Sequence, residues 1–270
     1  MFCASTTSIV SGVLTERIKL WPFLVYVIIL VVVIYPIQAS WKWGGGFLND
    51  MGFQDFTSST FVHSVSGWAA LTGAIFFSLR LGEYKGGKVN PMPGSNLALA
   101  TLGIFILWLS WFGFNSCSQL YMDTSGSVAD ISSIFSNTNT VAAAGAVAAL
   151  TLTPSLIQST MIGTVSGIIV VFAMPMLDRM KIDYVVDAIS VHLFAGIWGT
   201  LAVYFTNSAA TFSVQLTSTL IVGAFVTVTT AFVWLVLKAT AGLRVSEEVE
   251  IMSLGRNGLG VEAYPEFSSS

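Results

Sequence analysis

The chain has 270 residues, a net charge of −3 and only 9% charged residues, and its mean hydropathy is +0.78. Soluble domains carry about 25% charged residues, so this composition excludes a disordered chain, argues against a soluble enzyme and indicates a polytopic membrane protein. The 11 basic residues form no block that could follow a phosphate backbone, which excludes nucleic-acid binding. Cys3 and Cys117 are far apart and match no metal-binding spacing, so we expect no metal site.

Eight apolar segments reach or approach the 20 or so residues that cross a bilayer. The first is short, lacks the basic region of a signal peptide and indicates that the chain begins within a membrane segment. We expect a transmembrane domain over residues 1–240 and a polar cytoplasmic tail over residues 241–270. The candidate spans are residues 1–15, 20–39, 59–79, 95–116, 131–152, 156–177, 187–206 and 214–238.

The basic residues conflict with a simple alternation of these eight spans. Lysine and arginine favour cytoplasmic loops, and those that follow the first and third spans place both loops inside. Alternation would then put Arg179 and Lys181 outside, together with Lys238 and Arg244 in the last segment. The conflict arises between the fifth and sixth spans, whose connection is very short. Either one span is missing near Thr153, or the charge rule fails here.

The two histidines lie in predicted spans and in a repeated V-H-x-x-x-G motif. One copy contains His63 and Gly67, and the other contains His192 and Gly196. The charges orient these spans oppositely, as in the inverted repeats of transporters, whose sites lie near the midplane. We therefore predict that the imidazoles meet within hydrogen-bonding distance on antiparallel helices. The alternative is that each histidine only forms a hydrogen bond between helices.

Paired neutral imidazoles can pass a proton or hold a small polar molecule, because each offers one donor and one acceptor. A charge at the bilayer centre costs at least about 2.5–3.5 kcal/mol, so the cargo is expected to be neutral in transit. Asp55 and Asp187, upstream of the histidines, either cap the following helices or contact the cargo. The aromatic run 111–114 forms with Trp43 either an interfacial belt or a cation–π funnel.

Five segments resemble consecutive motifs of the ammonium transporter (Amt/Mep/Rh) family: WKWGGGFLND, DFTSSTFVH, PGSNLALATLG, LWLSWFGFNSCS and KIDYVVDAISVHLFAGIWGTLAV. The resemblance implies an all-α bundle of eleven helices, built from two inverted five-helix halves plus one helix, of which about eight are retained here. It further implies transport of ammonium or ammonia across the plasma membrane or bacterial inner membrane, a homotrimer with one pore per subunit, no cofactor and no enzymatic activity. A PII-type regulatory protein is the expected partner at the cytoplasmic face.

The resemblance also assigns roles around the pore mouth. Trp43, Ser118 and Phe2 match the external ammonium-recruitment site. Phe2 and Phe114 match a stacked aromatic gate beneath it. Asp55 matches the acidic residue that organises the recruitment site.

Within the pore, His63 and His192 match the family's paired histidines, and Asp187 matches the aspartate that heads the second histidine helix. The chain lacks the family's first two helices, the start of the third and the eighth, the last of these near Thr153. Larger side chains replace the usual Ala, Gly and Gly at three positions, Thr57, Ser58 and Cys117. We therefore expect little ammonium uptake by this chain alone. The alternatives are a non-conducting ammonium sensor and a nonfunctional fragment of a transporter.

Overall fold

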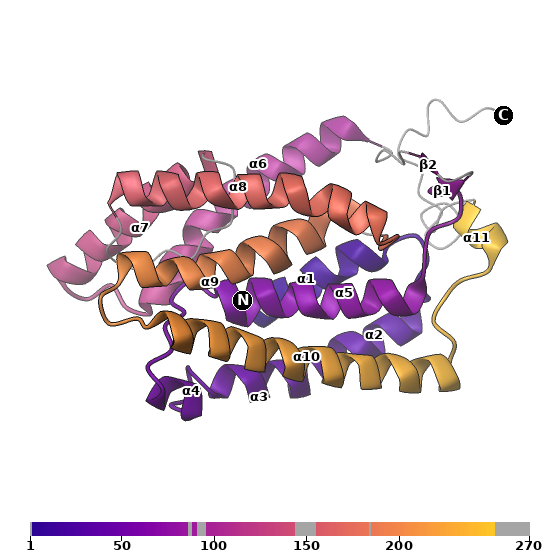
Figure 1. Ribbon diagram of the computed structural model, residues 1–270, viewed down its shortest axis with the longest axis horizontal. Coiled ribbons are helices and arrows are strands. Elements are labelled where there is room, and N and C mark those ends of the chain that lie inside the picture. The colour runs from indigo at the N-terminus through magenta and orange to yellow at the C-terminus, as the bar shows by residue number, and fades with distance from the viewer. Residues whose placement is uncertain (1, 86–87, 91–95, 144–154, 184, 252–270) are drawn as a thin grey trace.

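The computed structural model describes residues 2–85, 88–90, 96–143, 155–183 and 185–251, and its long helices lie side by side as a bundle (Figure 1). A two-stranded antiparallel hairpin, β1 (Tyr84–Lys85) and β2 (Lys88–Val89), follows the first histidine helix. The helical elements are α1 (Phe2–Leu14), α2 (Leu20–Ile29), η1 (Leu30–Ile34), α3 (Tyr35–Ser40), α4 (Phe47–Asp50), η2 (Ser59–Ser64), α5 (Val65–Phe77), α6 (Leu97–Ser116), η3 (Cys117–Gln119), α7 (Ser125–Ala143), α8 (Leu156–Arg179), η4 (Val185–Asp187), η5 (Ile189–Phe194), α9 (Ala195–Thr206), α10 (Phe212–Thr240) and α11 (Glu247–Ile251).

Six helical stretches in the described chain are long and apolar enough to cross a membrane, which confirms the predicted all-helical polytopic bundle. The first predicted span is the shorter α1, with 13 residues. The fifth is α7, which begins at Ser125 rather than at residue 131. The six stretches are Leu20–Ser40, Ser59–Phe77, Leu97–Gln119, Leu156–Arg179, Ile189–Thr206 and Phe212–Thr240.

The two ends of the bundle differ in charge. We call one end the basic end, and the opposite end, with Phe2 and Trp43, the aromatic end. Contacts between the loops after α1, α5, α8 and α10 bring the basic residues of these loops together. In the described chain, Lys42 is the basic side chain at the aromatic end. The basic end is marked by Arg17, Arg80, Arg179, Lys181 and Arg244.

Helices α7 and α8 run in the same direction along the bundle, which explains the conflict between the charges and simple alternation. The Ser159 hydroxyl of α8 donates to Asn137 of α7 at 3.2 Å. About one turn further along both helices, Val141 packs in one cluster with Ile162. Consecutive spans joined by a tight hairpin would instead be antiparallel. The predicted break in alternation is therefore confirmed, whereas the predicted missing span near Thr153 falls at residues 144–154, outside the described part of the chain.

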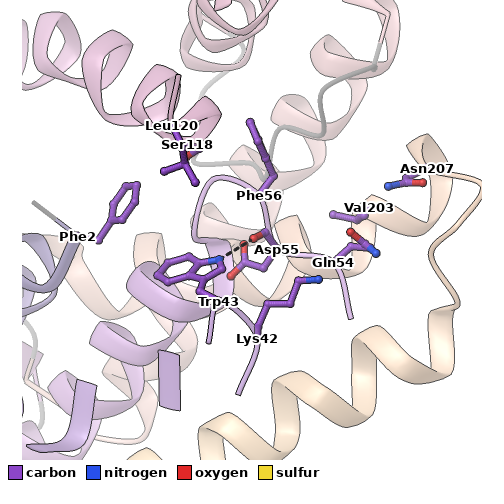
Figure 2. Close-up of a pocket in the computed structure, with 10 residues that line it drawn as sticks. All are labelled: Phe2, Lys42, Trp43, Gln54, Asp55, Phe56, Ser118, Leu120, Val203 and Asn207. Atoms are coloured by element: carbon purple, nitrogen blue, oxygen red, sulfur yellow. Dashed lines mark hydrogen bonds between the residues drawn. The ribbon is translucent and has the colours of Figure 1, made fainter. Parts of the chain in front are cut away.

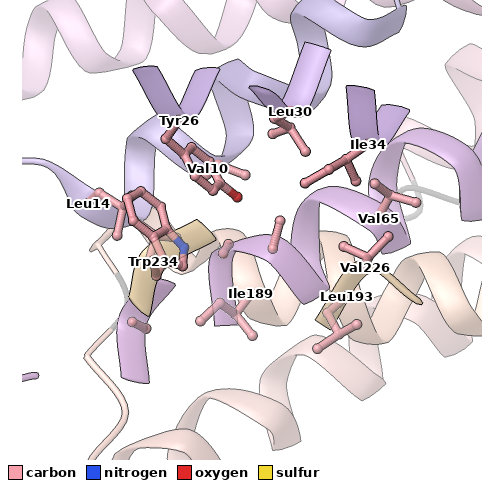
Figure 3. Close-up of a cluster of buried hydrophobic side chains, with 14 of the residues drawn as sticks. Val10, Leu14, Tyr26, Leu30, Ile34, Val65, Ile189, Leu193, Val226 and Trp234 are labelled. Carbon is pink, nitrogen blue, oxygen red and sulfur yellow. The ribbon is translucent and has the colours of Figure 1, made fainter. Parts of the chain in front are cut away.

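A hydrophobic core joins both histidine helices to α1, α2 and α10 (Figure 3). At its centre the Tyr26 ring of α2 stacks on Trp234 of α10, with centroids 3.8 Å apart and planes at 13°. Both side chains are fully buried, so this contact ties α2 to α10 along the side of the first histidine helix. The surrounding core residues include Val10, Leu14, Leu30, Ile34, Val65, Ile189, Leu193 and Val226.

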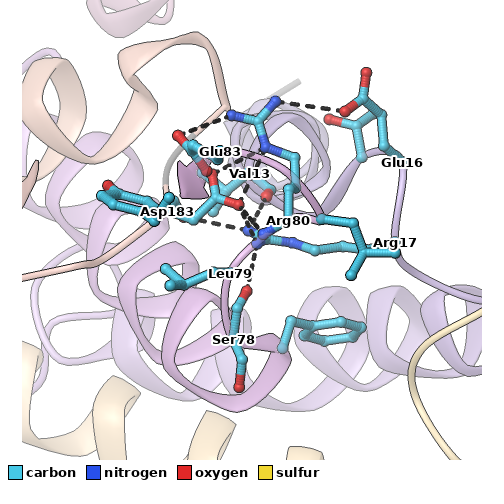
Figure 4. Close-up of polar contacts among 12 residues, drawn as sticks. Val13, Glu16, Arg17, Ser78, Leu79, Arg80, Glu83 and Asp183 are labelled. Atoms are coloured by element: carbon cyan, nitrogen blue, oxygen red, sulfur yellow. Dashed lines mark hydrogen bonds and ion pairs between the residues drawn. The ribbon is translucent and has the colours of Figure 1, made fainter. Parts of the chain in front are cut away.

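A buried ion network closes the basic end (Figure 4). Arg17 after α1 and Asp183 after α8 are wholly buried and lie 2.5 Å apart, and the Arg80 backbone and guanidinium also donate to Asp183. Burial raises the pKa of Asp183, but a hydrogen bond with Glu83 and the charges of Arg17 and Arg80 lower it more, so the net pKa is below its usual range. The network therefore connects the loops that follow α1, α5 and α8, which are distant in sequence.

We expect Arg17→Met to destabilise the protein by about 3–5 kcal/mol, because it leaves the buried Asp183 carboxylate without one of its two cations. The measurement is the thermal unfolding temperature of the purified protein in detergent. Lys181→Met is the matched control, because Lys181 is exposed at the same end. Equal unfolding temperatures for the two variants would contradict a stabilising role for the buried network.

Candidate functional site: an aromatic pocket above a histidine pair

The two histidines face each other between antiparallel helices. The η2–α5 helix runs from the aromatic to the basic end, and the η5–α9 helix runs back. The Nδ1 atoms of His63 and His192 are 2.9 Å apart, and the ring planes differ by only 4°. The predicted pairing is therefore confirmed. Such contact requires one Nδ1 to carry the proton and the other to accept it, so the geometry fits a pair that is not doubly protonated.

Each histidine lies in a π-helical turn, a form that is common at functional sites. Asp55 holds the first of these turns in place. Its carboxylate accepts hydrogen bonds from the backbone N–H groups of Ser59, Thr60 and Phe61 at 2.8–3.0 Å. Burial raises the pKa of Asp55 to about 6, although these backbone N–H groups favour the charged form. Ser58, not Asp55, is the N-cap residue of η2, but the Asp55 carboxylate accepts the backbone bonds of the first turn and so fixes the turn that carries His63.

We expect Asp55→Ala to destabilise the protein by about 2–4 kcal/mol, because three buried N–H groups lose a charged acceptor. Asp55→Asn keeps one acceptor oxygen and should have a smaller effect. The measurements are the unfolding temperature and hydrogen exchange of the amides of residues 59–61. Unchanged exchange of these amides in Asp55→Ala would contradict the capping role.

The glycine of each motif makes room for the other motif. A Cβ added to Gly67 would lie 2.5–2.6 Å from Leu193, partly from its backbone. A Cβ added to Gly196 would lie 2.9 Å from the Ser59 carbonyl oxygen and 3.3 Å from His63 Cβ. These reciprocal contacts let the two helices cross closely enough for the imidazoles to meet.

A buried threonine cluster beside the histidines was not anticipated from the sequence. The Thr60 hydroxyl lies 2.7 Å from the Thr200 hydroxyl on α9 and 3.3 Å from the Thr219 hydroxyl on α10. Gln215 of α10 also donates to the Thr200 carbonyl and bonds the backbone of Gln54. Nothing in the spacing of these residues distinguishes them from other polar residues in spans.

A pocket of about 700 Å³ opens at the aromatic end (Figure 2). Trp43 is 41% exposed there, and its indole N–H donates to the Asp55 carbonyl at 3.4 Å. The Ser118 hydroxyl is buried beside the pocket and has no hydrogen-bond partner within the described residues. The lining residues are Phe2, Lys42, Trp43, Gln54, Asp55, Phe56, Ser118, Leu120, Val203 and Asn207.

A series of rings leads from this pocket to the histidines. Phe2 lies 5.6 Å from Trp43 and 4.7 Å from Phe114, between ring centroids. Phe114 lies 5.9 Å from His63. The Phe2 and Phe114 rings meet edge to face at 76°, so the expectation of stacked rings is corrected. The rings of Trp43, Phe2 and Phe114 thus form a continuous series of contacts from the pocket to the histidine pair, and their faces can attract a cation.

Asp187 and most of the aromatic run lie away from this pocket. Asp187 precedes η5 on the side of the basic end, and burial, then the charge of Asp178, raises its pKa. The N-cap residue of η5 is Ala188, with no side-chain capping bond, so the capping interpretation of Asp187 is wrong. Phe112 stacks on Phe135 of α7, and Trp111 packs beside Phe114. Within the described residues, no group of three metal-ligating side chains is present.

Comparison with known proteins gives consistent results. The family model of the Ammonium Transporter Family matches residues 1–156 and 152–264. A putative ammonium transporter of Synechocystis sp., sll1017, is 34% identical, with 97% of this chain and 68% of that protein covered. Ammonium transporter Amt2 of Archaeoglobus fulgidus is 35% identical, with 99% and 69% covered.

Solved structures with the same fold include a "Sensor Amt Protein", at 28% identity and a TM-score of 0.87, covering 94% of this chain and 73% of that one. Mep2 of Candida albicans has a TM-score of 0.77 at 22% identity, with 92% of this chain and 65% of that one covered. This likeness concerns the fold alone.

The two family matches meet at residues 152–156, beside the point where the alternation of spans breaks. The alignment with sll1017 extends over 299 residues, more than the 270 of this chain, so that protein carries residues inside the aligned region that this chain lacks. The chain, a multi-pass membrane protein, belongs to the ammonium transporter family.

Proposed function

We propose that this chain captures ammonium at the Trp43 pocket and that, once the pore is completed by the segment that relatives carry inside the aligned region, ammonia passes between the paired histidines across a cell membrane. The observation that carries this proposal is the series of rings from Trp43 through Phe2 and Phe114 to His63 and His192. Conduction further requires the segment that relatives carry inside the aligned region, because a pore needs a continuous wall.

Capture uses the aromatic mouth. The faces of Trp43 and Phe2 attract NH4+ by cation–π contacts of about 0.5–2 kcal/mol each. The Ser118 hydroxyl accepts a hydrogen bond from the cation, and Asp55 holds the backbone that Trp43 contacts.

Passage follows deprotonation. A full charge near the bilayer centre costs at least about 2.5–3.5 kcal/mol, so NH4+ transfers one proton to a solvent water molecule at the mouth of the pocket, giving NH3 and H3O+, before NH3 passes the edge-to-face pair of Phe2 and Phe114. Neutral ammonia then exchanges hydrogen bonds with His63 and His192, whose ring nitrogens provide both a donor and an acceptor.

The proposal includes an orientation and an assembly. By the positive-inside rule the basic end faces the cytoplasm, with a transmembrane domain over residues 1–240 and a tail over 241–270. The tail begins against the membrane domain, since Arg244 donates to the Phe77 and Leu79 carbonyls. A homotrimer and a PII-type regulator at the basic end belong to the same proposal.

Ammonium sensing without conduction is the second candidate function. It is favoured by the TM-score of 0.87 with the "Sensor Amt Protein", which exceeds the 0.77 with Mep2. A sensor needs the Trp43 pocket but not an open path past the histidines.

We expect Trp43→Leu to weaken ammonium binding by about tenfold, because one cation–π contact of about 1–2 kcal/mol is lost. The measurement is the rise in unfolding temperature of the purified protein with increasing ammonium chloride. Trp111→Leu is the control, since Trp111 does not line the pocket. Equal binding by the wild type and Trp43→Leu would refute capture at this pocket.

A further inference from the structure

The charge balance of the Trp43 pocket is unusual for a site that captures a cation. Its ten lining residues include one acidic residue, Asp55, and one basic residue, Lys42. Figure 2 shows Lys42 next to Trp43 and near Asp55 and Gln54. In the described chain Lys42 is the basic side chain at the aromatic end, whereas the described arginines lie at the basic end. The pocket is therefore close to neutral rather than negative.

The Lys42 amine is held near the pocket and carries a charge. Its Nζ donates to the Asn49 side-chain oxygen at 3.0 Å, which anchors it to α4. Burial lowers the pKa of the amine, and the charge of Asp55 offsets part of this effect. Lys42 is only half-buried, whereas lysines that are neutral at pH 7 are fully enclosed. An ammonium group of the chain itself therefore shares the pocket with any ammonium ion that enters.

We propose that Lys42 sets the affinity and selectivity of this pocket, by placing a fixed positive charge against the incoming cation. This inference rests on the proposed capture of ammonium. Repulsion opposes the cation–π attraction of Trp43, so the pocket fills only at higher ammonium concentration. The same charge repels a divalent cation twice as strongly, because Coulomb energy scales with the product of the charges.

Anchoring of the loop is the structural alternative for Lys42, because its bond to Asn49 spans the turn between α3 and α4. Three variants separate the two roles. Lys42→Met removes both the charge and the bond with little change in volume. Lys42→Arg keeps the charge, and Asn49→Ala removes the bond but leaves the charge in place.

The experiment measures the unfolding temperature of the whole purified chain against ammonium chloride, with ionic strength balanced by sodium chloride. We expect Lys42→Met to bind ammonium about 3- to 30-fold more tightly than the wild type, because a like charge that solvent partly screens opposes binding by about 0.6–2 kcal/mol. Lys42→Arg and Asn49→Ala should bind like the wild type. The difference between wild type and Lys42→Met should shrink at high salt, because screening weakens repulsion. Lys42→Gln serves as a second neutral variant if Lys42→Met does not fold.

The outcomes separate this inference from the proposed function. Tighter binding by both neutral variants, together with weaker binding by Trp43→Leu, supports both. Tighter binding by the neutral variants, without any transport by a chain completed with the relatives' internal segment, leaves the role of Lys42 intact and refutes conduction alone. Equal binding by Lys42→Met and the wild type, or similar behaviour of Lys42→Met and Asn49→Ala, overturns the inference. No response to ammonium in any variant, the neutral ones included, also overturns it.

Discussion

Cells that lack their own ammonium transporters should gain no growth from this chain alone at limiting ammonium and low pH, where free ammonia is scarce. The physical reason is that α7 and α8 run in the same direction, and that the two family matches meet at residues 152–156, between these helices. We expect the wall of the pore to be incomplete without the additional residues of the relatives, and α6 is almost entirely exposed along its apolar length. A pore with an open side does not hold a continuous path for ammonia.

The test compares three proteins in the same cells: this chain, a full-length relative such as Amt2 of Archaeoglobus fulgidus, and a chimera. The chimera carries the relative's internal segment between Ala143 and Ser155. Growth should return with the relative and with the chimera, and in the chimera it should be lost again on His192→Ala. Rescue by the unmodified chain that depends on His192 would refute this prediction and show that the reduced bundle conducts.

Gly67→Ala should separate the two histidines and destabilise the protein by about 1–3 kcal/mol or more. The new Cβ would lie 2.5–2.6 Å from Leu193, including its backbone nitrogen and Cα, so the second histidine helix must move. A shift of this helix carries His192 away from the 2.9 Å contact with His63. The measurements are the unfolding temperature and the separation of the two rings in an experimental structure of the variant.

Gly103→Ala on α6 is the matched control, because its added Cβ would meet nothing within 4 Å. It should leave stability unchanged or raise it by up to about 1 kcal/mol through better helix propensity. A Gly67→Ala protein with wild-type stability and an intact histidine contact would show that the crossing tolerates a side chain, against the reciprocal-glycine argument.

Local patterns determined much of what could be predicted. Hydropathy identified the spans, because a membrane helix needs apolar side chains over the whole thickness of the hydrocarbon layer, which fixes its length. The repeated motif and the positions of Arg179 and Lys181 predicted that His63 and His192 meet on antiparallel helices. The same charges revealed the break in alternation that α7 and α8 display. These inferences succeeded because each rests on a constraint that acts along the chain or across the whole membrane.

Apart from the histidine pair, only the tertiary structure decided which side chains meet across the helix crossings. The partner of Arg17 is Asp183, 166 positions away, and the partner of Thr60 is Thr200 on another helix. In the sequence, nothing distinguishes Lys42 from the other residues of an external loop. The fold places it in the lining of the pocket that also contains Trp43. Such contacts depend on the angle and the distance at which two helices cross. Small residues such as Gly67 permit a close crossing, but their spacing in the sequence does not reveal which helices cross or at what angle.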